Sequence, residues 1–180
     1  MDYNKRIATV REYFRYYFDS AYSAVNMAIR DKDKLTKDFI ERIMLAVTEV
    51  NGCKVCSQAH AKMALESGMT DEEISLLLSN DKNKVPDYQS VAVMFATHYA
   101  DKSGRPDKES LERLKNKYGE RVSKSIIAVC RIIMLGNAFG IAMDTIKRSN
   151  KLRELTIFIG SIILAPVYIL VMIAGILFNR

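Results

Sequence analysis

The stretch from Asn51 to His60, which reads NGCKVCSQAH, carries the residues best suited to chemistry. Cys53 and Cys56 are separated by two residues, and His60 follows Cys56 by four. On a helix, at 100° per residue, these three side chains fall within roughly 60° of arc. A helix N-terminus favours a thiolate because partial positive charge gathers there. The spacing therefore predicts a dithiol that can close to a disulfide, beside an imidazole that can carry a proton.

Two other interpretations of the same residues remain open. A zinc ion could bind two cysteines and one histidine, but a structural zinc site takes four ligands. The other candidates are Cys130, within AVCRIIMLG, and His98, within FATHYADKSG, and neither has a partner at ligand spacing. Cys130 fits a small buried apolar residue, and His98 a surface or hydrogen-bonded core histidine. A chance CxxC within a helix is the second alternative. The thiol chemistry itself needs no cofactor.

Composition narrows the class of protein. The chain has 180 residues, 49% hydrophobic and 27% charged, which fits one ordinary domain and excludes a disordered chain or a coiled-coil rod. The net charge of +6 comes from basic residues spread along the chain, so we expect no nucleic-acid partner. Three cysteines fit a secreted disulfide scaffold poorly, so we expect reduced thiols inside a cell. The charged N-terminal stretch predicts no secretory signal peptide.

Residues 155–178 form an apolar segment of 24 residues without a charge. As a helix it would be roughly 36 Å long, against about 30 Å for the hydrocarbon core of a bilayer. No polar stripe interrupts it, so we expect a transmembrane tail anchor, with a helix buried in an oligomer core as the alternative. Basic residues precede it, namely Lys147, Arg148, Lys151 and Arg153. The positive-inside bias then places the body, residues 1–150, in the cytoplasm of a single-pass membrane protein.

The body is expected to be helical nearly throughout, so the predicted fold class is all-α. Apolar residues at three- and four-residue steps predict one long first helix, with Ile7, Val10, Phe14, Tyr17, Phe18, Ala21, Tyr22, Val25 and Ile29 on its buried face. Capping and glycine signals predict further helices over 36–51, 54–66, from Thr70, 87–101, 107–118 and 120–147. The aromatic residues from Tyr13 to Phe18 fit a core, with an interfacial membrane belt as the alternative.

The residues resemble a known family when one more side chain is included. The chain contains the pattern Glu-x11-Cys-x2-Cys-x3-His, formed by Glu41, Cys53, Cys56 and His60. This pattern is similar to the signature of the alkylhydroperoxidase D (AhpD)-like proteins of the carboxymuconolactone decarboxylase superfamily. The next segment, AKMALESGMTDEEISLLL, resembles that family's continuation, and RIIMLGNAFGIAMDTI resembles its last core helix more loosely. The likeness covers roughly residues 20–147. One departure is Val55, where some members carry a second histidine.

This resemblance implies an oligomeric, AhpD-like helical bundle that reduces peroxides through a dithiol–disulfide cycle. Carried over to this chain, Cys56 would be attacked first by peroxide and Cys53 would resolve the sulfenic acid to a disulfide. His60 and Glu41 would form the proton relay, although spacing alone makes Glu41 an ordinary surface glutamate. The electron donor implied is a lipoyl-bearing or thioredoxin-like protein.

Other functions use the same residues. The superfamily also contains lactone decarboxylases, but that branch does not look like this chain at the cysteines. A membrane-tethered redox sensor or interaction module would use the same disulfide without turnover, and a degenerate, purely structural member is a third possibility. We expect an enzyme, a peroxidase anchored at the membrane, whose position beside the bilayer favours lipid-derived hydroperoxides or a membrane-bound redox partner.

Overall fold

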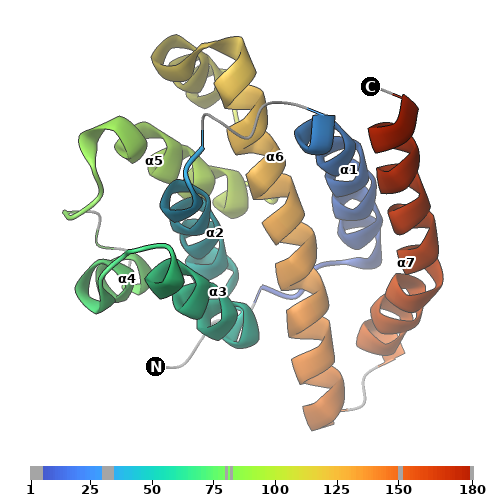
Figure 1. Cartoon of the computed structure of the whole chain (residues 1–180). Coiled ribbons are helices and arrows are strands. Elements are labelled where there is room, and N and C mark those ends of the chain that lie inside the picture. Colours follow the sequence, from blue (N-terminus) through green and yellow to red (C-terminus); the bar gives the residue numbers. More distant parts are fainter. Residues whose placement is uncertain (1–5, 30–34, 80, 82, 150–151, 179–180) are drawn as a thin grey trace.

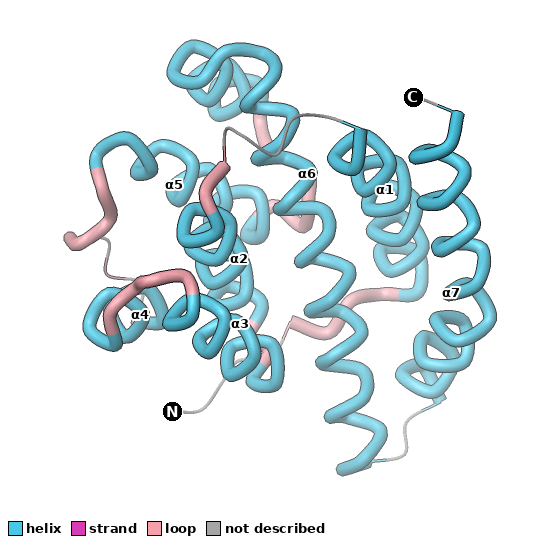
Figure 2. Tube along the Cα trace, viewed as in Figure 1, coloured by secondary structure: helices cyan, strands magenta, loops and turns pink. Residues whose placement is uncertain are grey.

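The computed structural model describes residues 6–29, 35–79, 81, 83–149 and 152–178. Throughout this part of the chain every regular element is a helix, which confirms the all-α class (Figure 2). The helices are α1 (Val10–Ile29), α2 (Lys37–Asn51), α3 (Lys54–Glu66), α4 (Asp71–Leu78), α5 (Asp87–Asp101), α6 (Lys108–Ser149) and α7 (Leu152–Phe178). The predicted helix boundaries in the body are therefore largely correct.

Helix α6 is the central element. It runs through the middle of the molecule, with α2–α5 on one side and α1 and α7 on the other (Figure 1). Large apolar side chains along it are fully buried, including Leu114, Ile126 and Met134. Gly119 has a φ of 74° and interrupts the helical geometry, which is where the sequence predicts one helix to end and the next to begin. The long second part of α6 thus forms the wall against which the redox segment packs.

Local capping signals explain where the shorter helices begin and end. Gly52 adopts a left-handed conformation (φ 68°, ψ 33°) and ends α2, as a glycine after the last turn often does. The Thr70 side chain accepts a hydrogen bond from the Glu73 backbone, and the Glu73 carboxylate accepts one from the Thr70 backbone, a complete capping box for α4. Thr36 occupies the cap position of α2 without a side-chain hydrogen bond.

The predicted buried face of α1 is partly wrong. Tyr13, Tyr16 and Tyr17 are buried, but Phe14, Phe18 and Tyr22, which the three- and four-residue pattern assigned to the core, are exposed. The cause is the packing of α1 between two neighbours, since it contacts both α6 and α7. The buried arc is therefore turned toward the tyrosines, and an aromatic row at Phe14, Phe18 and Tyr22 remains outside.

Helix α7 lies parallel to α1 along its length (Figure 1). The Tyr13 hydroxyl contacts the Ser161 hydroxyl, the Tyr17 hydroxyl donates to the Leu164 carbonyl at 2.7 Å, and the Ser20 and Tyr168 hydroxyls lie 3.0 Å apart. The nearly constant offset between these partners in sequence is what two parallel helices in register produce. The apolar C-terminal segment is thus a helix, as expected, and its Ser161 and Tyr168 hydroxyls face α1.

A test by length and composition finds one helix, within the described part of the chain, that is long and apolar enough to cross a membrane. It is the central helix, Lys108–Ile146, and 56% of its apolar window is buried inside the protein. A buried core helix meets the same criterion, so this result is weak evidence for a span. The apolar stretch found in α7, Leu155–Leu170, is shorter. The membrane span expected at 155–178 therefore stays a prediction.

Candidate redox site

The turn between α2 and α3 positions the two cysteines. Gly52 reverses the chain direction, and Cys53 caps α3 in an extended conformation, with the Cys56 backbone N–H donating to its sulfur at 3.3 Å. Because α3 begins at Lys54, Cys53 lies just outside the helix. The shared helical face inferred from sequence therefore holds for Cys56 and His60, one turn apart, while Cys53 is brought in by the cap.

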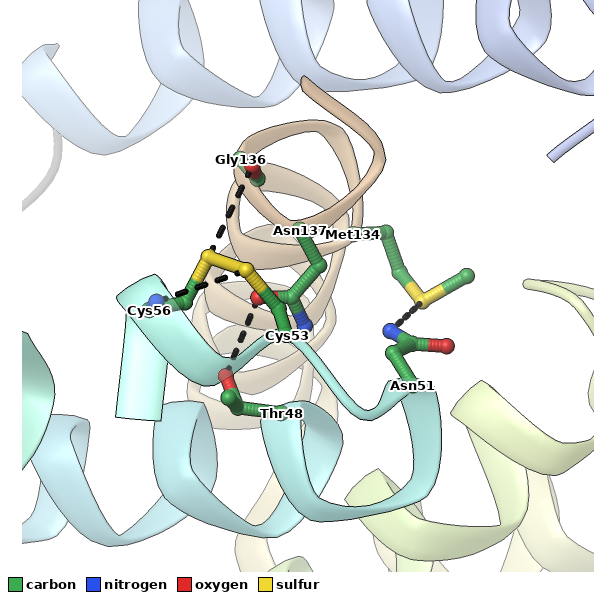
Figure 3. Close-up of a disulfide and its surroundings, with 7 residues drawn as sticks. All are labelled: Thr48, Asn51, Cys53, Cys56, Met134, Gly136 and Asn137. Atoms are coloured by element: carbon green, nitrogen blue, oxygen red, sulfur yellow. Dashed lines mark hydrogen bonds between the residues drawn. A yellow bond between two sulfur atoms is a disulfide. The ribbon is translucent and has the colours of Figure 1, made fainter. Parts of the chain in front are cut away.

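Cys53 and Cys56 form a disulfide, with Cα atoms 5.3 Å apart (Figure 3). That separation lies in the normal range for a disulfide. The two sulfurs differ in access, because Cys53 is buried, with 2% of its surface exposed, while Cys56 is partly exposed. A reagent from outside therefore reaches the residue at position 56 more readily than the one at position 53.

Glu41 and His60 form a close pair, and His60 follows Cys56 by one helical turn on α3. The His60 Nδ1 atom lies 2.8 Å from the Glu41 Oε2 atom, and both side chains are largely shielded, with 14% and 12% of their surface exposed. Glu41 comes from the middle of α2 and His60 from α3, so the packing of these helices creates the contact. A carboxylate that accepts from Nδ1–H fixes the tautomer in which Nε2 can take up a proton.

Helix α6 forms the other wall of the site. Gly136 lies with its carbonyl oxygen 3.8 Å from the Cys56 sulfur, and Gly140 approaches both sulfurs closely. Between them, the fully buried Asn137 accepts a hydrogen bond from the Thr48 hydroxyl of α2 at 3.1 Å (Figure 3). Spacing alone pointed to none of these α6 residues, because they lie about eighty positions from the cysteines.

Three buried polar atoms near the cysteines have no hydrogen-bond partner among the described residues. They are the Asn51 Oδ1, the Ser57 Oγ and the Asn137 Nδ2 atoms. Asn51 and Ser57 flank the cysteines in sequence, and Asn137 packs beside them from α6. Leaving buried hydrogen-bond donors and acceptors without partners costs free energy. The surroundings of the cysteines therefore contain polar groups that can still form hydrogen bonds, unlike an ordinary apolar core.

The remaining candidates from the sequence lie elsewhere. Cys130 is a free thiol, completely buried in α6, as expected for a small apolar residue, and burial raises its pKa well above the ordinary value. His98, near the end of α5, pairs with the Asp107 carboxylate at 2.9 Å and fits the expected hydrogen-bonded surface histidine. Across the described ranges, no cluster of three or more histidine, cysteine or acidic side chains is arranged to hold a metal ion.

The arrangement can carry a two-electron thiol cycle. One sulfur is reachable, the second is buried behind it, and the hydrogen bond from the Cys56 N–H to the Cys53 sulfur favours a thiolate there. In thiol–disulfide exchange, the sulfur that is the better-stabilised thiolate leaves faster. An outside thiol that attacks Cys56 would therefore expel Cys53 toward its cap position.

Part of the chain is similar in sequence to known proteins. Residues 17–82 match the model of the Carboxymuconolactone decarboxylase family. Over 62 residues, the chain is 34% identical to a protein named Alkyl hydroperoxide reductase AhpD from Corynebacterium kroppenstedtii, a match that covers 32% of this chain and 36% of that relative. The chain thus spans only about a third of the length of this curated relative. No solved structure matches. The segment that matches the family model contains Glu41, both cysteines and His60, so over this part the chain is similar to AhpD-like proteins.

Proposed function

We propose that this chain is a thiol-dependent peroxidase that cycles between a Cys53–Cys56 dithiol and a disulfide. The observation that carries the proposal is the disulfide at the start of α3, with the Glu41–His60 pair anchored one turn further along the same helix. The similarity to a protein named an alkyl hydroperoxide reductase favours an organic hydroperoxide as the oxidant.

The oxidative half of the cycle begins at the more exposed sulfur. His60 Nε2 takes the proton of Cys56, and the thiolate attacks one peroxide oxygen, so that an S–O bond forms and the O–O bond breaks. The imidazolium returns its proton to the alkoxide, which leaves as an alcohol. Cys53 then attacks the sulfenic sulfur, the S–O bond breaks, and water leaves with the Cys53 proton. The net change converts one hydroperoxide and two thiols to an alcohol, water and a disulfide.

The reductive half needs an external dithiol. Its thiolate attacks the Cys56 sulfur, Cys53 leaves as the capped thiolate, and the second donor thiol resolves the mixed disulfide. The donor becomes a disulfide and the protein regains two thiols. We propose a lipoyl-bearing or thioredoxin-like protein in this role, since both present a dithiol on a mobile or exposed surface.

We propose that the protein associates with a membrane through α7. Large apolar side chains of this helix are exposed at Ile159, Ile162, Ile163, Val167, Ile169, Leu170 and Ile173. The hydroxyl groups of Ser161 and Tyr168 face α1, which suits lipid because hydrocarbon cannot satisfy them. The body would lie in the cytoplasm, and lipid-derived hydroperoxides or a membrane-bound redox partner would be its targets.

We further propose that the protein is a homo-oligomer. Helix α3 exposes Val55 next to the redox turn, and Met63 and Leu65 near its C-terminal end. Exposed apolar side chains grouped on one element are typical of contact surfaces. Light scattering of the detergent-solubilised chain at several concentrations measures the subunit number, and a monomer at all of them would refute this part.

The decisive experiment supplies the full chain, in detergent micelles, with tert-butyl hydroperoxide and dihydrolipoamide. Many turnovers per protein are expected, and intact mass without the donor should show a loss of two hydrogens. Cys56→Ser should abolish peroxide consumption, whereas Cys53→Ser should stop at a sulfenic acid that dimedone traps. Cys130→Ala is the matched control and should leave turnover unchanged. One equivalent of peroxide consumed, with no turnover, would instead identify the redox sensor, and no oxidation at all would refute both functions.

A further inference from the structure

Gly140 is the residue of α6 at which an added side chain would meet the redox pair. A Cβ atom built there would stand 2.7 Å from the Cys53 sulfur and 2.9 Å from the Cys56 sulfur. Real Cβ atoms do not approach other heavy atoms so closely, so any side chain at position 140 would displace one or both sulfurs. The disulfide therefore rests directly on the bare backbone of α6.

Glycine is otherwise a poor choice at this position. Gly140 lies inside a long helix, where glycine costs about 1 kcal/mol relative to alanine. Gly136, one turn earlier on the same helix, does not share the constraint. A Cβ there would meet only the Ile133 Cδ1 atom, at 3.9 Å, an ordinary contact. The close approach is thus a property of position 140 alone.

We propose that Gly140 is a positioning residue that sets the balance between the dithiol and the disulfide, an inference that rests on the proposed redox cycle of the same cysteines. In the disulfide, the S–S bond holds both sulfurs against Gly140. In the dithiol, the bond is gone, and Cys56, which is partly exposed, can rotate away from α6. A side chain at position 140 therefore opposes the disulfide more strongly than the dithiol.

The first test compares Gly140→Ala with Gly136→Ala, both in the full chain in detergent. Each variant is equilibrated with mixtures of reduced and oxidised dithiothreitol, so that two electrons and two protons pass between the dithiothreitol and the protein. Alkylation and mass spectrometry then count the free thiols. Gly140→Ala should lower the equilibrium constant for oxidation at least tenfold, which corresponds to about 30 mV. Gly136→Ala should change it less than threefold, although both substitutions raise helix propensity equally.

The second test does not depend on redox activity. In a Cys53→Ala, Cys56→Ala background the sulfurs are absent, so Gly140→Ala should raise the unfolding temperature, as Gly136→Ala does. In the native background, the oxidised Gly140→Ala variant should unfold at a lower temperature than the oxidised parent. A variant that folds with the cysteines reduced but not with the disulfide closed supports the inference in the same way.

Several results would overturn the proposal. Equal oxidation constants for the two alanine variants would remove any special role for Gly140, as would failure of Gly140→Ala to fold even without the cysteines. If the parent chain forms the disulfide but does not turn over peroxide, the proposed function fails while these comparisons still judge Gly140. If the parent never forms the disulfide, the proposed function and the role of Gly140 in the redox balance both fail.

Discussion

The His60 Nδ1 atom lies 2.8 Å from the Glu41 Oε2 atom, a contact that joins α2 to α3 one helical turn after Cys56. In the proposed cycle, the Glu41 carboxylate would orient the ring and support the imidazolium that forms when Nε2 accepts a proton. This role is testable, because glutamine at position 41 has the same shape as glutamate and keeps the contact with His60 but lacks the negative charge.

Glu41→Gln should therefore lower kcat/KM for tert-butyl hydroperoxide by about 10²-fold, the lower end of what positioned proton transfer contributes. The unfolding temperature and the yield of disulfide should stay close to those of the parent. Glu49→Gln is the control on the same helix, since burial raises the pKa of Glu49 but the residue has no place in the relay. Equal rates for the two variants would show that Glu41 has no part in proton transfer.

Thr48→Val should destabilise the protein by about 1–3 kcal/mol, because it removes the donor to the buried Asn137 side chain and leaves that acceptor unsatisfied. The control is the same substitution at Thr97, whose hydroxyl bonds only to the Val93 carbonyl of its own helix. Chemical denaturation of both variants measures the difference. Similar losses at the two sites would argue against a special contribution from the Thr48–Asn137 bond.

Glu73→Gln should cost about 1–2 kcal/mol at pH 7, because the buried Arg42 guanidinium loses a carboxylate at 3.2 Å while the glutamine retains the cap of α4. The backbone bond to Thr70 and the charge of Arg42 lower the pKa of Glu73 below 4.5. A lowered folded-state pKa stabilises the protein above the unfolded value, and this contribution is lost as pH falls through the folded value.

The difference between parent and Glu73→Gln should accordingly shrink as the pH falls from 7 to 3. Glu72→Gln serves as the control, because the Glu72–Lys84 pair is exposed and such pairs contribute little. Thermal unfolding at a series of pH values provides the readout. A gap between parent and variant that stays constant with pH would assign the loss to packing instead of charge.

Association of the full chain with phospholipid vesicles should be visible by flotation, since the outward side of α7 is apolar. A double substitution, Ile163→Asp and Leu170→Asp, should reduce the floated fraction several-fold, because charge in hydrocarbon is costly. Met94→Asp alters an exposed apolar residue of α5 and should leave flotation unchanged. Flotation that is insensitive to the α7 substitutions would remove the membrane role from this helix.

Local signals explain why so much of the helix layout could be predicted. Gly52, Thr70 and Gly119 act through their own backbone and near neighbours, so their effects are readable in sequence. The Cys53–Cys56 pair is equally local. The Glu41–His60 contact joins two helices and reached the prediction only through the family resemblance. Gly140 carries no local signal, because its role depends on where α6 lands against α3.

The outer face of α1 shows the opposite limit. The spacing of apolar residues predicts that a helix has a buried face, but it does not predict how many other elements pack against that helix. Here α7 occupies a second side of α1, so Tyr13 and Tyr17 are buried and Phe14 is not. Helix α7 lies nearly 150 residues further along the chain, and no pattern within α1 predicts that it packs there.

The register between α1 and α7 has a practical consequence for handling the protein. A recombinant version shortened before Leu152 would keep every redox residue but lose the cover over Tyr13, Tyr17 and Ser20. Removing α7 would thus expose the side of α1 that it covers and create a new apolar surface on the remaining domain. A truncated chain in aqueous buffer would therefore aggregate. The full-length protein in detergent or lipid nanodiscs is the form in which its chemistry is best examined.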